Sequence, residues 1–198
     1  MNALLALSRG IDALNALIGK AVTWLVLAAV VISAGNAVVR KTLDYSSNAW
    51  LEIQWYLFSA FFLLCAGYTL LRNEHIRIDI VAGNFSRRTQ TWIEIIGTVF
   101  FLFPMVALVL FEAWPWALRA IESGEISASA GGLVLWPAKI LVPMGFILLA
   151  LQGVSELIKR IAFLRGIGPD PGERLVDKSP EQLLAEEIRR ERGDVEPV

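Results

Sequence analysis

Three ionisable side chains stand within or beside long apolar stretches of the sequence, and they are the first candidates for chemistry. They are Glu52, Glu112 and Lys139. Ionisable groups in such stretches mark either an ion or proton pathway or an ion pair that fixes how helices pack. All three are expected near one membrane interface and not at the midplane, where coupling sites usually lie. We therefore predict an ion pair, with Lys139 held by Glu112 or by Glu52.

The sequence offers little else for catalysis or cofactor binding. His75 is the only histidine and Cys65 the only cysteine, which excludes an internal disulfide, most metal clusters and a haem with two histidine ligands. The sequence contains no glycine-rich phosphate loop, no nucleophile motif and no pair of carboxylates within one apolar stretch. We expect no catalytic residue, no metal and no cofactor. The net charge of −1 gives no electrostatic footprint for nucleic acid.

The distribution of charge indicates a membrane protein with a polar tail. Of the 198 residues, 56% are hydrophobic, and residues 159–198 hold 17 of the 37 charged side chains. The rest of the chain could not supply a charged surface all round, as a soluble domain requires. We predict an all-α integral membrane protein with a membrane domain over 1–165 and a cytoplasmic tail over 166–198. In the tail, the Ser179-Pro180 start predicts a short cytoplasmic C-terminal helix over about 180–192.

Four apolar runs are long enough to cross a bilayer, which takes about 20 residues. Helices are the only sensible conformation for them, because a backbone in lipid must satisfy its own hydrogen bonds. Tryptophans mark the expected ends of these runs, as is typical of membrane interfaces. The predicted spans cover about residues 21–39, 51–71, 92–118 and 133–157.

Lysines and arginines in the short loops set the orientation. Nine lie on one side, in the N-terminal segment, in the 72–91 loop and after the fourth span, against three on the other side. The positive-inside rule therefore predicts that both termini and the 72–91 loop are cytoplasmic. Glu94 and Glu156 then lie at the cytoplasmic ends of their spans, facing headgroups or Arg72 and Arg160.

Residues 2–19 show an amphipathic pattern. Leu4, Leu7 and Leu14 recur on one side, and Asp12 and Asn15 fall on the other. We favour a separate interfacial helix along the inner leaflet, because the polar stripe would be costly in hydrocarbon. The alternative is an N-terminal extension of the first span.

The second span and the loop after it resemble a known family. The chain has Trp50-Leu-Glu52, then an apolar helix, then Leu71-Arg72-Asn-Glu-His75-Ile-Arg77-Ile-Asp79. This pattern resembles the small permease (Q, or DctQ-like) subunit of tripartite ATP-independent periplasmic (TRAP) transporters. Length, four spans and cytoplasmic termini match as well, so the resemblance covers roughly residues 10–165. Cys65 stands where many members have glycine.

The resemblance implies a non-catalytic subunit of a three-part importer in the bacterial inner membrane. A periplasmic binding protein captures an organic acid and meets the membrane subunits transiently. A large M subunit carries the substrate with sodium, and the Q subunit packs against its scaffold. The stretch 127–139 resembles a branch associated with mannitol, chloroaromatic or 2-oxo-acid uptake, so the substrate is expected to be a carboxylate, with a 2-oxo acid as one candidate.

The resemblance and the small residues of span two predict the interface with the large subunit. Small side chains let membrane helices approach closely, so spans two and three are expected to form the docking face. The residues predicted to serve partner contact or structure are Glu52, Cys65, Gly67, Arg72, His75, Arg77 and Asp79. Two alternatives stay open: a self-contained small four-span transporter that uses Glu52 or Glu112, and a membrane anchor of another complex.

Overall fold

The computed structural model describes residues 1–45, 47–73 and 85–169. These residues form helices joined by short connections, and the one β-type contact among them is an isolated bridge between Ile126 and Val134. The helices are α1 (Asn2–Leu43), α2 (Asn48–Leu71), α4 (Arg87–Gly97), the π-helix η1 (Thr98–Leu102), α5 (Phe103–Ser123) and α6 (Trp136–Leu164). The predicted C-terminal helix over about 180–192 lies outside the described residues, as do His75, Arg77 and Asp79.

Four helical segments are long and apolar enough to cross a membrane, as the sequence predicted. The first, second and fourth are α1, α2 and α6. The third is a continuous helical segment from Arg87 to Ser123, made of α4, η1 and α5. The five-residue π-helix adjoins Pro104, which has no N–H to donate. There the N–H of Phe103 reaches back to the carbonyl of Thr98, and the helix continues through this widened turn.

The N-terminal segment does not form a helix of its own. Asn2–Leu43 is one uninterrupted helix of 42 residues, which at 1.5 Å per residue is about 60 Å long. This is the alternative that the sequence left open, and it replaces the favoured interfacial helix. The helix is about twice as long as the hydrocarbon core is thick. Its N-terminal half contacts α6, and α1 also packs against α2.

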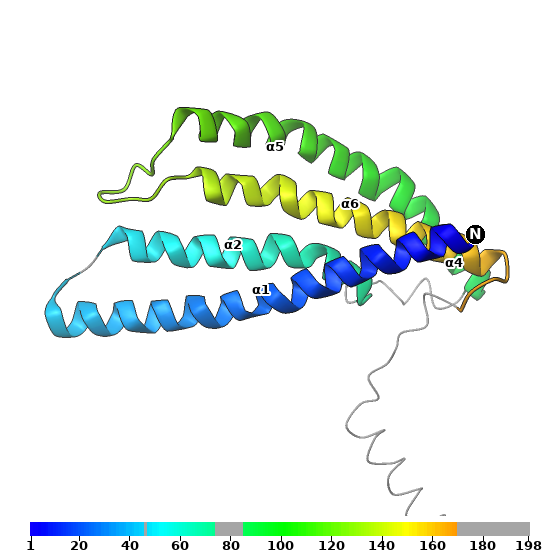
Figure 1. The fold of residues 1–198 in the computed structure, drawn as a ribbon, viewed down its shortest axis with the longest axis horizontal. Helices are drawn as coiled ribbons and strands as arrows, with labels where there is room; N and C mark the ends of the chain where they lie inside the picture. Colours follow the sequence, from blue (N-terminus) through cyan, green and yellow to red (C-terminus); the bar gives the residue numbers. More distant parts are fainter. Residues whose placement is uncertain (46, 74–84, 170–198) are drawn as a thin grey trace, which may run out of the picture.

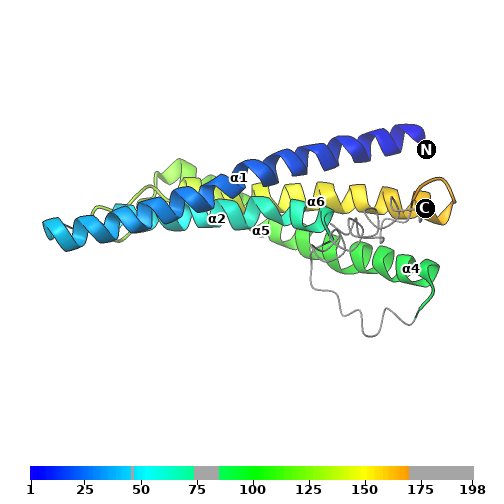
Figure 2. The same cartoon turned by 90° about the horizontal axis from the view of Figure 1, so that it is seen from below.

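The spans lie side by side in a row and do not close into a bundle. Figure 1 shows the order α1, α2, α6, α5 across the molecule. Figure 2 shows that the helices overlap in a narrow band at one end and spread apart toward the N-terminus, where α1 and α4 lie on opposite sides of α6. The α6 helix packs against every other helix, and the N-terminal half of α1 reaches it as well. In α6, 44% of the most apolar stretch is buried, against 11% or less in the other three spans. The core of the protein is therefore formed by α6 and by the side chains of the other helices that pack against it.

Glycines permit the close contacts between these helices. A Cβ atom at Gly19 would meet the ring of Tyr68, one at Gly145 would meet the backbone of Leu63, and one at Gly153 would meet Leu102. The three contacts join α1 to α2, α6 to α2 and α6 to η1, respectively. Small residues are expected where membrane helices approach closely.

Gly67 is buried inside the chain, which corrects its predicted place on the docking face. A Cβ atom there would lie 2.2 Å from Asn15 Oδ1 and 3.1 Å from the carbonyl oxygen of Leu148. Cys65 also faces inward, with Sγ 3.9 Å from the carbonyl oxygen of Gly19. The middle of α2 therefore uses its small residues to hold α1 and α6, and leaves no room at Gly67 for a helix from another protein.

We predict that Gly67→Ala destabilises the isolated chain. The added methyl group has no space between α1 and α6, and overpacking of this kind costs about 1–3 kcal/mol in free energy of unfolding. Gly35→Ala is the matched control, because nothing lies within 4 Å of a Cβ at Gly35. Thermal unfolding of the purified chain in detergent measures both. Equal melting temperatures for the two variants would show that Gly67 is not packed as described.

Candidate functional site

Nine polar side chains gather where the N-terminal half of α1 crosses α6, and we call them the polar cluster. They come from α1, α4 and α6, and all lie toward the end of the molecule that holds the N-terminus (Figure 1). The members are Ser8, Asp12, Asn15, Glu94, Gln152, Ser155, Glu156, Lys159 and Arg160.

Helical spacing explains why these residues meet. The polar residues of α1 recur at steps of four and three, and those of α6 begin at Gln152 and recur at steps of three, one, three and one. Each set therefore forms one stripe along its helix. The stripes face each other, and the apolar residues of the same part of α1, such as Leu4 and Leu7, are exposed instead. The sequence favoured an interfacial helix because a polar stripe is costly in hydrocarbon. In the structure the stripe avoids that cost by facing the polar stripe of α6.

The uncharged half of the polar cluster is completely buried. Ser8 Oγ and Ser155 Oγ are 2.7 Å apart, and Asn15 Nδ2 donates to Gln152 Oε1 at 3.0 Å. Ser8, Asn15, Gln152 and Ser155 are each 1% exposed or less. Hydrogen bonds of this kind hold membrane helices together, because an unsatisfied polar group is costly in hydrocarbon.

The Asp12 carboxylate connects the uncharged half to the charges of α6. It accepts hydrogen bonds from Ser155 Oγ at 2.6 Å and from Gln152 Nε2 at 2.9 Å. Lys159 Nζ lies 3.2 Å from Asp12 Oδ2 and also pairs with Glu156. One carboxylate of α1 is thus held by three side chains of α6.

Arg160 extends the polar cluster to α4. Its Nε donates to Glu94 Oε2 at 2.7 Å, and its Nη1 donates to Glu156 Oε2 at 2.6 Å. Arg160 is 3% exposed and Glu156 is 2% exposed. The structure thus confirms that Glu94 and Glu156 face Arg160, and burial makes this pairing necessary, since a single buried charge is strongly unfavourable.

The side chains of the polar cluster are occupied by contacts between helices. The polar cluster contains no thiol or imidazole, its two hydroxyl groups bond each other, and every carboxylate in it faces a cation or several donors. Among the described residues, no group of three or more metal-binding side chains is found that could hold an ion.

Glu52 forms a second polar site, at the opposite end of the molecule, where it holds the connection between α5 and α6. Its Oε2 accepts the backbone N–H of Leu133 at 2.6 Å, and its Oε1 accepts the hydroxyl of Ser127. Tyr56 supports the same connection by donating to the carbonyl of Val134 at 3.0 Å. The acidic position at the head of α2 therefore joins α2 to the 124–135 loop.

The predicted partner of Lys139 was wrong. Lys139 Nζ pairs with Glu125, just beyond the end of α5, and lies 4.8 Å from the centre of the Trp116 ring. Glu52 is engaged with the 124–135 loop, and Glu112 is exposed on α5. The physical reason is position: Lys139 is in the first turn of α6, so its side chain meets the residues that lead into that turn.

Of the predicted interface residues, Arg72 ends α2 at the cap position, where its N–H donates to the carbonyl of Tyr68 at 3.0 Å. The structure does not bring the predicted residues together in one site. Glu52 lies near the start of α2, Cys65 and Gly67 lie in its last third, and Arg72 lies at its end. The sequence analysis missed Gln152 and Ser155, although the 3-and-4 spacing of polar residues on α6, matching that on α1, was the signal that could have found them.

A comparison with protein families finds a match over most of the chain. The model described as "Tripartite ATP-independent periplasmic transporters, DctQ component" matches residues 29–163. This range includes Glu52, the loop that it holds and the α6 side of the polar cluster. Comparisons with curated proteins and with solved structures give no match.

We predict that Glu156→Leu destabilises the chain by about 1.5–3 kcal/mol, because two charged hydrogen bonds are lost and the cations keep only Asp12 and Glu94. Lys159 and Arg160 both lose this carboxylate. Glu112→Leu is the matched control, since Glu112 is exposed on α5, and it should not lower the melting temperature. A Glu156→Leu variant as stable as the control would contradict the role of the polar cluster.

We also predict that Glu52→Leu loosens the 124–135 loop without unfolding the helices. The Leu133 amide loses its acceptor in this variant, so it should exchange with solvent faster than in the wild type. Hydrogen exchange followed by mass spectrometry of this loop measures the effect. Glu122→Leu, on the exposed surface of α5, should leave exchange unchanged, and equal exchange in both variants would rule out the proposed bond.

Proposed function

The chain belongs to the DctQ family, the small membrane component of TRAP transporters, and we propose that it acts as a scaffold for the large permease subunit of such a transporter. In this proposal the protein lies in the bacterial inner membrane with both termini in the cytoplasm, as the basic residues of the loops predict. The transporter takes up an organic acid with sodium, and the substrate and sodium sites belong to the large subunit. A periplasmic binding protein delivers the substrate and contacts the membrane subunits transiently.

The observation that carries this proposal is the open row of helices. The polar residues of the two sites described above are used in contacts between helices or between a helix and a loop. The outer surfaces are apolar, with residues such as Trp24, Phe62 and Phe111 more than two-thirds exposed. A row that is held together by its own contacts and apolar on its outside is suited to widening another membrane protein.

The location of the two polar sites at opposite ends of the molecule supports the same proposal. The polar cluster would lie at the cytoplasmic end, where it fixes α1 against α6. Glu52 would lie at the periplasmic end, where it fixes the 124–135 loop that the binding protein could meet. Both ends of the row would then be held in shape, which a scaffold needs and a moving carrier does not.

Reconstitution in liposomes tests the proposal, using this chain together with the large permease and the binding protein of the same transporter. We expect the tagged chain to copurify with the large subunit, and sodium-dependent uptake of the organic acid to require all three proteins. Liposomes with this chain alone should show none. Uptake by this chain alone would establish the self-contained transporter instead, and failure of the wild-type chain to copurify would overturn the scaffold role.

A further inference from the structure

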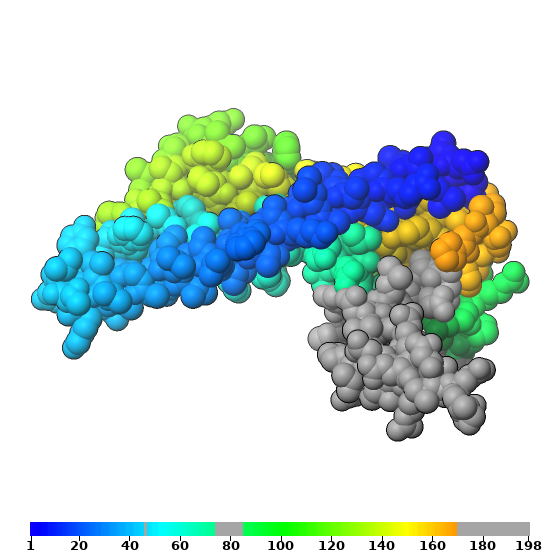
Figure 3. Space-filling view, turned by 60° about the horizontal axis from the view of Figure 1, so that its bottom comes forward, coloured from blue at the N-terminus to red at the C-terminus, as the bar shows by residue number. Residues whose placement is uncertain are grey.

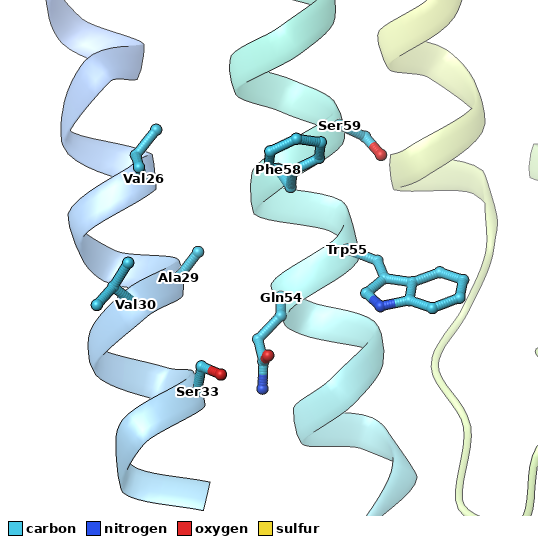
Figure 4. Close-up of a pocket in the computed structure, with 8 residues that line it drawn as sticks. All are labelled: Val26, Ala29, Val30, Ser33, Gln54, Trp55, Phe58 and Ser59. Carbon is cyan, nitrogen blue, oxygen red and sulfur yellow. The ribbon is translucent and has the colours of Figure 1, made fainter.

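The hollows between neighbouring helices differ in the charge of their walls. The groove between α1 and α2 has a volume of about 560 Å³, and its lining, shown in Figure 4, contains no charged residue. The hollow between the end of α5 and the start of α6, which we call the α5–α6 pocket, has a volume of about 480 Å³. Four of the seven residues that line it are charged: Arg119, Glu122, Glu125 and Lys139.

Two of the four charges in the α5–α6 pocket hold each other. Lys139 Nζ pairs with Glu125 and lies 4.8 Å from the centre of the Trp116 ring, which also lines the pocket. The Lys139 side chain is only 14% exposed, and a cation over an aromatic ring is attracted by the ring. This pair is satisfied within the chain and needs no ligand.

Arg119 and Glu122 are the charges of the α5–α6 pocket that the chain leaves unpaired. Both are exposed, and the side chain of neither forms an ion pair or a hydrogen bond with another described residue. They stand three residues apart on α5, so they lie on the same face of the helix. The pocket therefore offers one free positive and one free negative charge side by side, and its lining has no net charge.

The residues beside these two charges place the α5–α6 pocket at the boundary between hydrocarbon and headgroups. Leu118 is 40% exposed and Ile121 is 45% exposed, so α5 presents apolar side chains almost to its end at Ser123. Trp116 belongs to a residue type that favours this boundary. Figure 3 shows the end of α5 and the start of α6, in yellow-green, at the end of the molecule away from the N-terminus. The group that meets the pocket there is a phospholipid headgroup.

We propose that the α5–α6 pocket binds the headgroup of phosphatidylethanolamine, with Arg119 on its phosphate and Glu122 on its ammonium group. A guanidinium donates two parallel hydrogen bonds to phosphate oxygens, and the ammonium group donates to the carboxylate of Glu122. A headgroup that carries both charges suits a lining without net charge, whereas phosphatidylglycerol has the phosphate but no ammonium group for Glu122. The inference does not depend on the scaffold role.

The bound headgroup would support a part of the chain that Glu52 already holds. Arg119 and Glu122 lie close to the end of α5, which leads directly into the 124–135 loop. Glu52 accepts the N–H of Leu133 in that loop. The lipid would thus fix the beginning of the loop, and Glu52 fixes its far end.

Binding of phosphatidylethanolamine and of phosphatidylglycerol to the purified full chain, measured by mass spectrometry of the intact complex, tests the α5–α6 pocket. We expect the wild type to prefer phosphatidylethanolamine, and Arg119→Gln to bind it several-fold more weakly. Arg40→Gln is the matched control, because Arg40 is exposed in the last turn of α1 and does not line the pocket. Glu122→Gln should keep binding and lose the preference for phosphatidylethanolamine.

Three results would overturn the proposal: equal binding by Arg119→Gln and Arg40→Gln, equal binding of the two lipids by the wild type, or displacement of the lipid by inorganic phosphate, which would indicate a site for a free anion. A photo-crosslinking residue at position 123, which lines the pocket and is exposed, keeps the proposal testable if a substitution harms folding. In the complete transporter we expect an adduct with phosphatidylethanolamine. An adduct with another protein in its place would assign the pocket to a protein partner and contradict the lipid site.

Discussion

The structure depends on one constraint: a polar side chain on a membrane helix needs a partner on another helix. The polar stripe of α1 meets the polar stripe of α6, and between them Asp12 and Lys159 join the uncharged and charged halves of the polar cluster. This contact turns the apolar side of the N-terminal segment outward and makes α1 a single helix of 42 residues. Burial in hydrocarbon makes each such bond hard to replace, because water is not available as an alternative partner.

With α1 and α5 both held against α6, the remaining surfaces of the row stay open. The buried polar cluster fixes one end and Glu52 fixes the other. The glycines between them bring the backbones together, so shape is set by contacts within the chain and the outer faces are left apolar. This arrangement is consistent with the scaffold role proposed for this member of the DctQ family.

The sequence was sufficient for the four spans, because long apolar runs have few alternatives in a bilayer. For Glu94 and Glu156 it left two possibilities, lipid headgroups or arginines, and the structure shows both acids paired with Arg160. It was not sufficient for the direction in which a helix face points. The pattern of Asp12 and Asn15 shows a polar stripe, but only the matching stripe on α6 shows that it is buried. Gly67 fits an outer or an inner contact equally well, and only the position of Asn15 decides between them. Lys139 was given the wrong acid because Glu125 is brought near it by the turn after α5, which spacing alone does not reveal.

The most direct test of this account measures the distance between α1 and α6 at the polar cluster. Spin labels placed at Leu7 and Ile161, both exposed, in a chain with Cys65→Ser report that distance in detergent or lipid. The account predicts one narrow distance distribution for the otherwise unchanged chain, and a broader, longer one after Asp12→Leu together with Ser155→Leu. A distribution that stays narrow and unshifted in the double variant would contradict the claim that the polar cluster holds α1 against α6.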